Sequence, residues 1–220
     1  MESYQNLSPK RRHDLAARAL RENPGGYHLL GFPPLSEDPE ERSSRYHMHL
    51  REAQRSVKEH HLLVTTRDRL SHEPFLPLYI YLDHLRSAHN VGSIIRTTEA
   101  LRLGTVVFSN QTPNLTNKKV RDTAMGAHEN LPTKECPLID LPRPFIGLET
   151  VQGAHSIYDF PFPKSFTLIV GNEEFGISKE VLAECDHLVT IPLVGCKNSL
   201  NVACAYAIAA GMIRHLLSEI

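Results

Sequence analysis

The sequence predicts an α/β protein in which a parallel sheet is covered by helices on both faces and is preceded by a mostly helical extension. Three observations support this prediction. From Leu78 onward, short runs of β-branched and other apolar residues alternate with segments of helical periodicity. Runs such as 78–83 and 166–171 are apolar at almost every position, as the buried strands of parallel sheets are. With 220 residues, 41% of them hydrophobic and 22% charged, the chain is long enough for one such domain with an appendage.

The expected elements follow one another in the order that a parallel sheet requires. Strands are expected over residues 78–83, 105–109, 145–149, 166–171 and 187–193. Helices are expected over residues 91–103, 118–125, 179–185 and 199–217, with a shorter one near 154–158. The proline-rich stretch 132–144 is interpreted as a surface connection. Ligands of such sheets bind beyond the carboxyl ends of the strands, so the residues that follow strands are candidates for the site.

Residues 1–75 differ in character from residues 76–220, and we expect a domain boundary between them. Helices are expected over residues 9–21 and 39–61, separated by segments rich in Pro and Gly. The first 75 residues carry 12 Lys and Arg against 11 Asp and Glu, with a basic cluster at Lys10, Arg11 and Arg12 and further basic residues along the second helix. A charge run of this kind is usually a solvated helix face, and contact with RNA phosphates is the alternative.

Composition limits the class of protein. A formal net charge of -1 excludes a strongly basic nucleic-acid coat, although it permits a local basic patch. No apolar run reaches the roughly 18 residues that a membrane helix needs, and the polar N-terminus is unlike a signal peptide. The four cysteines show neither metal-type spacing nor a disulfide framework, which favours a cytoplasmic location. The thirteen histidines lack metal-ligand spacing and are expected to be scattered over the surface, so no metal is predicted.

The segment 188–205 organises the second part of the chain. It begins as a β-branched apolar run, passes through a Pro and a Gly, and enters the pattern 199–217, which is apolar on nearly every face. We therefore expect a strand, a tight loop and a buried helix. Ser199 alone is equally well explained as a helix N-cap. Asn201 is harder to explain in this way, because Asn is a poor residue for a helix interior.

A second segment, 168–178, leaves a buried strand at Gly171, turns through Glu173 and Glu174, and enters a helix that Ser178 is expected to cap. Glycines allow a backbone to approach a ligand closely. No GxGxxG sequence occurs, and the two carboxylates would repel a pyrophosphate, so the segment does not indicate an ordinary dinucleotide-binding enzyme.

A third segment, 82–104, follows the first predicted strand. Asn90 can cap a helix, and Arg96 lies less than two turns further along that helix, which is otherwise apolar. An Arg in such a setting needs an anionic or carbonyl partner. A salt bridge to Glu99 is the simple alternative on spacing alone.

Together these segments resemble the three motifs of the SpoU (TrmH) family of the SPOUT class of RNA methyltransferases. The motifs are Asn-Val-Gly-Ser-Ile-Ile-Arg at 90–96, Gly-Asn-Glu-Glu-Phe-Gly at 171–176 and Ile-Pro-Leu-Val-Gly-Cys-Lys-Asn-Ser-Leu-Asn at 191–201. Ala-Met-Gly-Ala at 124–127, between the first two, also agrees. One motif alone would be weak, but all of them in the family's order and spacing form a specific signature. The resemblance covers residues 76–220 and leaves residues 1–75 outside.

The resemblance implies an α/β fold with a C-terminal trefoil knot, a homodimer, and transfer of a methyl group from S-adenosylmethionine to a ribose 2′-hydroxyl of tRNA or rRNA, with no metal, DNA or membrane involved. The catalytic residues that it implies are Asn90, Arg96, Glu173, Ser199 and Asn201. The residues that it places in the cofactor cleft, mainly through their backbone groups, are Gly171, Ile191 and Leu200. We further expect each active site to combine Arg96 of one chain with Ser199 and Asn201 of the other.

A different class of function remains as the alternative. A protein that binds or assembles RNA on the same scaffold, without activity, would share the fold. The presence of the whole polar set favours the enzyme.

Overall fold

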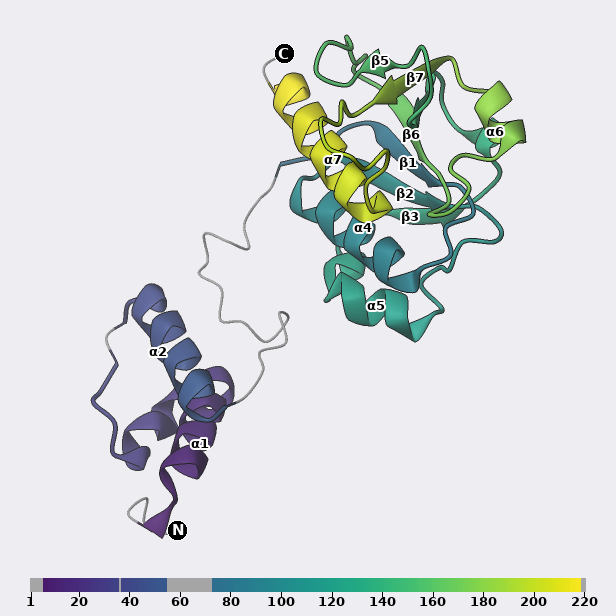
Figure 1. Cartoon of the computed structure of the whole chain (residues 1–220). Coiled ribbons are helices and arrows are strands. Elements are labelled where there is room, and N and C mark those ends of the chain that lie inside the picture. The colour runs from purple at the N-terminus through teal and green to yellow at the C-terminus, as the bar shows by residue number, and fades with distance from the viewer. Residues whose placement is uncertain (1–5, 36, 55–72, 219–220) are drawn as a thin grey trace. The chain divides into compact units, whose positions relative to one another are not determined.

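The computed structural model describes residues 6–35, 37–54 and 73–218, and the chain divides into two compact units, Met1–His72 and Glu73–Ile220 (Figure 1). Each unit has its own hydrophobic cluster.

The first unit consists of two α-helices joined by a 3-10 helix. Its elements are α1 (Pro9–Glu22), η2 (Pro24–Leu30) and α2 (Pro39–Glu52). Ser8 caps α1 and Asp38 caps α2, and each helix then begins with a proline, a combination that favours helix initiation. The helix predicted at 9–21 is confirmed. The one predicted at 39–61 ends at Glu52, and residues 55–61 of that prediction lie outside the described part of the chain.

Basic side chains of α2 hold the first unit together. Arg42 donates from Nε to the carbonyl oxygen of Leu20 at 3.0 Å. Arg45 donates to the carbonyl oxygen of Pro33 at 3.0 Å and pairs with Glu41 at 2.6 Å. These two arginines of the predicted charge run therefore serve internal contacts.

One histidine of the first unit is buried, which corrects the expectation that the histidines are scattered over the surface. His49 has no exposed area, and its ring lies 2.8 Å from Nδ1 of His13 on one side and 2.8 Å from the hydroxyl of Tyr27 on the other. Burial, followed by the nearby charges of His13, Arg45 and Arg12, lowers the pKa of His49 to about 4. His49 is therefore neutral at pH 7.

The second unit is built on a seven-stranded parallel sheet. Its strands are β1 (Leu78–Leu82), β2 (Gly104–Phe108), β3 (Thr133–Glu135), β4 (Phe145–Leu148), β5 (His155–Ser156), β6 (Phe166–Val170) and β7 (His187–Thr190). They lie in the order β3-β2-β1-β6-β4-β7-β5, and every pairing is parallel. The helical segments are α4 (Ala88–Ala100), α5 (Lys118–Ala124), η4 (Ala127–Glu129), η5 (Leu138–Asp140), α6 (Lys179–Ala183) and α7 (Val202–Ser218). The predicted α/β class with a parallel sheet is confirmed.

Helices cover both faces of this sheet (Figure 1). Along β1, Leu78, Ile80 and Leu82 face the main core, which α4 and α7 complete. The alternate residues of the same strand, Tyr79 and Tyr81, belong to a smaller cluster that α6 covers. Because successive side chains of a strand point to opposite faces, a strand buried on both sides has to be apolar throughout.

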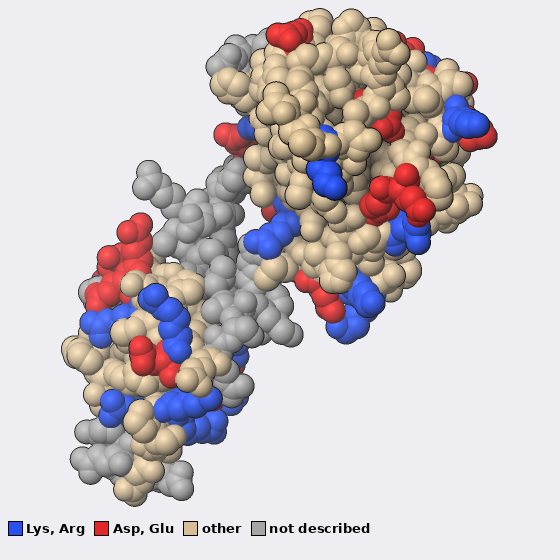
Figure 2. All heavy atoms as spheres, in the orientation of Figure 1, with Lys and Arg blue, Asp and Glu red and all other residues tan. Residues whose placement is uncertain are grey.

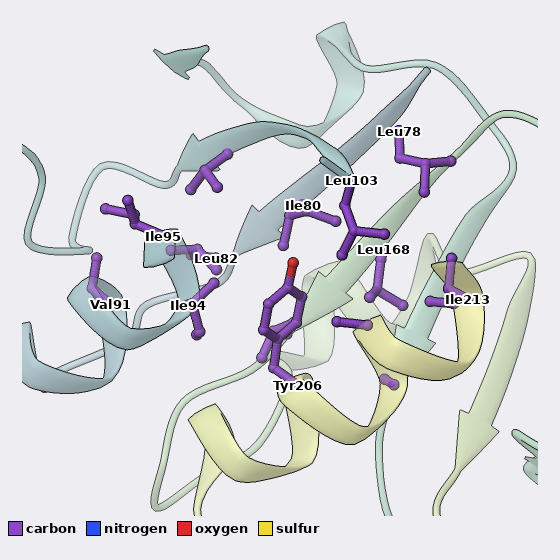
Figure 3. Packing of buried hydrophobic residues seen from close by; sticks show 14 of the residues in the cluster. Leu78, Ile80, Leu82, Val91, Ile94, Ile95, Leu103, Leu168, Tyr206 and Ile213 are labelled. Carbon is purple, nitrogen blue, oxygen red and sulfur yellow. The ribbon is translucent and has the colours of Figure 1, made fainter. Parts of the chain in front are cut away.

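Tyr206 of α7 joins the last helix to the main core. Figure 3 shows its ring among the buried aliphatic side chains of α4, α7 and the strands. Its hydroxyl lies 2.6 Å from Oγ1 of Thr98, which donates in turn to the carbonyl oxygen of Ile94 at 2.7 Å. Burial raises the pKa of Tyr206, so it stays a neutral phenol.

Four expectations about local structure were wrong. The segment 132–144 contains β3, and the short helix predicted near 154–158 is replaced by β5. Ser87 caps α4, and Asn90 lies in the first turn of that helix. The last helix begins at Val202 and not at Ser199.

The last helix is also not buried on every side. Tyr206, Ala209, Ala210 and Ile213 are buried. The opposite face of α7 is exposed at Cys204, Ala207, Ile208, Gly211 and His215. Ile208 alone keeps 40% of its area accessible. An apolar helix face left open in one chain indicates a surface that another molecule can cover.

Glycine at position 92 lets α4 and α5 approach each other. A β-carbon there would lie 2.6 Å from Cβ of Thr123 and 2.7 Å from the carbonyl oxygen of Val120. Both contacts are shorter than van der Waals distance, so the close packing of the two helices requires glycine.

Candidate active site

The site is built where the first motif, the second motif and the start of α7 meet at the carboxyl end of the sheet. The loop after β6 forms a tight turn, in which Asn172 and Gly176 exchange backbone hydrogen bonds of 2.8 and 2.9 Å. Asn172 also accepts from the backbone N–H of Glu174 at 2.9 Å and donates to the carbonyl oxygen of His84 at 2.6 Å. The turn is therefore fixed both internally and to the segment that follows β1.

Glu173, at the tip of this turn, anchors the start of α4. Its Oε2 accepts from the backbone N–H of Arg86 at 2.8 Å, and its Oε1 accepts from that of Ser87 at 3.0 Å. Oε1 also accepts from Nδ2 of Asn90 at 2.8 Å. Partial burial opposes ionisation, but the hydrogen bonds from Arg86, Asn90 and Ser87 outweigh it and hold the pKa of Glu173 below its usual value. Glu173 is therefore an ionised acceptor that orients Asn90.

Asn90 in turn connects Glu173 to the start of α7. Its Oδ1 accepts from Nδ2 of Asn201 at 3.1 Å. Oδ1 of Asn201 accepts from the backbone N–H groups of Ala203 at 3.0 Å and Cys204 at 3.3 Å. Asn201 is thus the N-cap of α7, which explains an Asn that is unfavourable inside a helix. The line Glu173, Asn90, Asn201 joins all three sequence motifs within one chain.

A cleft of about 310 Å³ opens beside this line. The loops that follow β4, β6 and β7 form its walls, together with the start of α7. The three residues predicted to contact a cofactor, Gly171, Ile191 and Leu200, all line it. Glu173 and Ser199 of the predicted catalytic set line it too. Small-molecule sites commonly measure roughly 300 to 1,000 Å³, so the cleft is large enough to hold a ligand.

Gly171, which has no side chain, brings its backbone to the cleft lining. Gly171 is buried, and a β-carbon there would lie 2.2 Å from the backbone nitrogen of Ile177. Glycine at 171 is therefore needed for the loop to fold back on itself. This is a structural reason for the glycine, in addition to the expected approach of a ligand.

Arg96 lies apart from the other predicted catalytic residues. Six residues separate it from Asn90, which places it about 9 Å along α4 and on a different side of the helix. Its side chain is exposed, and Nη1 contacts Sδ of Met125 at 3.0 Å. Met125 ends α5 in a left-handed conformation, with φ of 52°, which is unusual for a residue other than glycine. The expected set is therefore assembled only in part by one chain.

Two carboxylates at the ends of strands were missed by the sequence analysis. Asp83 follows β1, is 1% exposed, and accepts from the backbone N–H of Ser178 at 2.7 Å. This hydrogen bond connects the start of α6 to the end of β1. Glu149 follows β4 and lines the cleft. The rule that ligands bind beyond the carboxyl ends of parallel strands could have found both.

Two other features are not found among the described residues. None of the described helices has both the length and the apolar character needed to cross a bilayer. Within residues 6–35, 37–54 and 73–218, His, Cys, Asp and Glu side chains do not gather in a group of three or more suited to a metal ion.

Known proteins match the second unit. The family model for the SpoU rRNA Methylase family matches residues 77–211. The chain is 32% identical over 143 residues to 23S rRNA (guanosine(2553)-2′-O)-methyltransferase RlmP of Bacillus subtilis, a match that covers 62% of this chain and 56% of the relative. It is 29% identical over 146 residues to 23S rRNA (guanosine-2′-O-)-methyltransferase RlmB of Neisseria meningitidis, with coverage of 62% and 56%.

Solved structures give the same result. The SpoU methyltransferase AviRb from Streptomyces viridochromogenes has a TM-score of 0.59 and 25% identity, and the match covers 70% of this chain and 64% of that one. The AdoMet-bound rRNA methyltransferase from Sinorhizobium meliloti has a TM-score of 0.59 and 25% identity, with coverage of 64% and 56%. The chain thus matches little more than half the length of these curated relatives. Because the family model spans more than half of its 220 residues, the chain belongs to the SpoU rRNA methylase family.

Proposed function

We propose that the protein transfers a methyl group from S-adenosylmethionine to a ribose 2′-hydroxyl of tRNA or rRNA. The observation that carries this proposal is the line Glu173, Asn90, Asn201, which joins the three motifs and borders a cleft lined by the expected cofactor residues. The named activity of the relatives supports it. When bound, S-adenosylmethionine would supply an electrophilic methyl group on a cationic sulfur.

The chain's own residues would position the acceptor. A ribose hydroxyl is a weak nucleophile, so alignment and removal of its proton are the tasks of the site. Arg96 is exposed, and a guanidinium stays protonated at neutral pH, so it is suited to hold an RNA phosphate and polarise the neighbouring hydroxyl. The hydroxyl proton would then leave to a phosphate oxygen or to water. Asn90, Glu173, Asn201 and Ser199 would keep the start of α7 and the acceptor ribose in place.

The test is the chemical position of the transferred methyl group. Purified protein is incubated with a methyl-labelled donor and total RNA from cells that lack the gene, and the RNA is then hydrolysed with alkali. A 2′-O-methyl group blocks cleavage of the adjacent phosphodiester, so the label is expected in alkali-resistant dinucleotides. Label in base-methylated mononucleotides would contradict the proposal, and absence of label with every RNA fraction would favour the inactive scaffold.

We also propose that the enzyme is a homodimer whose active sites are shared. Arg96 contacts Met125 and lies on a different side of α4 from Asn90. The exposed face of α7, with Ala207, Ile208 and Gly211, supplies a small apolar surface on which a second copy can pack closely. Arg96 of one chain would then complete the site formed by Ser199 and Asn201 of the other.

A mixing experiment tests the shared site. Arg96→Ala and Asn201→Ala, each inactive alone, are produced together in one cell. Half of the dimers are mixed under random pairing and each regains one intact site, so activity should recover to roughly a quarter of wild type. If both residues act from the same chain, every site is broken and the mixture stays inactive.

Residues 1–75 are proposed to add RNA affinity. The remainder of the chain carries 12 basic and 14 acidic residues, and Figure 2 shows no continuous basic stripe on the displayed face of the second unit. Deleting residues 1–72 should weaken RNA binding and flatten its salt dependence. An unchanged salt slope would mean that the basic residues of 1–75 do not contact RNA phosphates. They would then be solvated or serve internal contacts, as Arg42 and Arg45 do.

Two further expectations stay predictions. One is the C-terminal trefoil knot, which the family resemblance implies, and the other is the cytoplasmic location, which the cysteine pattern favours. Resistance of the start of α7 to hydrogen exchange in strong denaturant tests the first, and fractionation of cells tests the second.

A further inference from the structure

The cofactor cleft is acidic. Its lining includes Glu149, Glu173 and Glu174, and the described residues that line it include no Lys, Arg or His. Glu174 forms an ion pair with Arg86, and Glu173 is bound by three N–H donors. Of the three carboxylates, Glu149 is the one that lies outside the sequence motifs.

Glu149 is held in a fixed position by the backbone. Its Oε2 accepts from the backbone N–H of Ile177 at 2.9 Å, and its Oε1 accepts from that of Thr150 at 2.8 Å. Within the described part of the chain, no cationic side chain pairs with it. Each carboxylate oxygen can accept two hydrogen bonds and here accepts one from the backbone, so the group can accept further hydrogen bonds.

Gly176 leaves room in the loop for the carboxylate of Glu149. A β-carbon on Gly176 would lie 2.3 Å from Oε2 of Glu149. Gly176 also has a positive φ of 72°, which a side chain would strain. The second motif thus leaves the space that the Glu149 carboxylate occupies.

We propose that Glu149 is a specificity residue, which makes the cleft favour the cationic methyl donor over its neutral demethylated product. The inference rests on the proposed function for the identity of the ligand. Transfer breaks the bond between sulfur and methyl carbon, forms a bond between that carbon and the ribose oxygen, and releases the hydroxyl proton to solvent. The sulfonium thereby becomes a neutral thioether, and the ligand loses one positive charge.

A fixed, unpaired carboxylate in a cleft interacts with that charge and not with the neutral sulfur. At an effective dielectric constant of about 20, opposite charges within one cleft still interact appreciably, and solvent at the cleft mouth weakens the effect. We expect Glu149 to change the ratio of the two affinities about fivefold. The same preference would help the product to leave after each transfer.

The experiment measures binding by calorimetry with the full chain and without RNA. The ligands are S-adenosylmethionine, S-adenosylhomocysteine, and sinefungin, which carries an amine in place of the methylated sulfur. Glu149→Gln should lower the affinity ratio of S-adenosylmethionine to S-adenosylhomocysteine about fivefold, and the ratio for sinefungin should follow it. Glu149→Asp, which keeps the charge, should retain most of the preference. Glu174→Gln should have a smaller effect, because Arg86 already neutralises Glu174.

Several outcomes would overturn the proposal. An equal loss of affinity for all three ligands would mean that Glu149 contacts a neutral part, such as the ribose hydroxyls. An unchanged affinity ratio in a Glu149→Gln variant that still binds the ligands would exclude an electrostatic role for Glu149. Binding of all three ligands without methyl transfer to any RNA would refute the proposed function while leaving this inference intact.

Discussion

The two units of the chain use polar side chains in different ways. In the first unit, arginines on α2 bind carbonyl oxygens and carboxylates of the same small fold, and His49 is buried as a neutral group. In the second unit, Glu173 stays ionised and receives three N–H groups from the segment 86–90, at the edge of a cleft. A high density of charged residues therefore does not by itself mark the candidate site. What distinguishes the second unit is a carboxylate with convergent donors beside open space.

The largest expected effect tests whether the exposed Arg96 belongs to the site at all. Arg96→Ala should lower methyl transfer by at least about 100-fold, a typical loss for a contact that stabilises a transition state. S-adenosylmethionine binding should change less than about twofold, because Arg96 does not line the cleft. Rates with labelled donor and calorimetry give the two quantities. Lys118→Ala, an exposed cation on the neighbouring helix α5, is the control. Retention of more than about a tenth of the rate would remove Arg96 from the proposed mechanism.

The unfolding free energies of the two units should depend differently on pH. The pKa of His49 is about 4 in the folded chain and about 6.5 in the unfolded chain, so its contribution is complete above pH 6.5 and is lost as pH falls toward 4. The first unit should lose about 2 to 3 kcal/mol of unfolding free energy in that window. Glu173 has a lowered pKa, so its contribution persists until the pH falls below about 4.5.

Pulsed hydrogen exchange in urea, resolved by peptide, measures each unit in the intact chain at each pH. His49→Gln should remove the pH dependence of the first unit, while His28→Gln, at an exposed position of η2, should preserve it. Equal destabilisation of both units between pH 6.5 and 4.5 would contradict the assignment to His49.

A substitution in the turn at Gly176 tests whether the cleft depends on its shape. Gly176→Ala places a methyl group against the Glu149 carboxylate and strains a left-handed backbone, so S-adenosylmethionine should bind about tenfold more weakly. Gly153→Ala is the matched control, because Gly153 also has a positive φ but a β-carbon there meets nothing within 4 Å. Similar affinity losses in the two variants would point to general backbone strain.

The smallest effect distinguishes the two residues that compete for the start of α7. Asn201→Ala removes a helix cap and should lower the unfolding free energy of the second unit by about 1 kcal/mol. Ser199→Ala should leave it nearly unchanged, because Ser199 is exposed and precedes the helix. Urea denaturation of the two variants makes the comparison, and a larger loss for Ser199→Ala would reverse the assignment.

The sequence predicted most of the second unit because its central strands are buried on both faces. The strands at 78–83, 105–109, 145–149, 166–171 and 187–193 all exist, with ends displaced by at most a few residues. The edge strands β3 and β5 were missed because they are two or three residues long and carry little apolar pattern. Their backbones are strand-like only because a neighbouring strand pairs with them.

The sequence predicted the candidate site as a set of residues but not as an arrangement. Motif order identified Glu173, Asn90 and Asn201, yet only the folded chain shows that they bond in a line. Glu149 and Asp83 carry no motif signal, and their importance depends on which backbone N–H groups reach them. The sequence did not settle which face of α7 is exposed, because small apolar residues look the same in sequence whether they face a core or an open surface.

The close contact at Gly92 affects how a mutational scan of this family would be interpreted. Gly92 lies inside the first motif, so a scan that records only loss of activity would rank it beside Asn90 and Arg96. The structure gives it a different role, since a larger residue would push α5 away and carry Met125 from beneath the Arg96 side chain. Trimming Thr123 would not restore the fit, because the backbone carbonyl oxygen of Val120 also lies 2.7 Å from the same β-carbon position, so loss of activity at Gly92 would report helix packing.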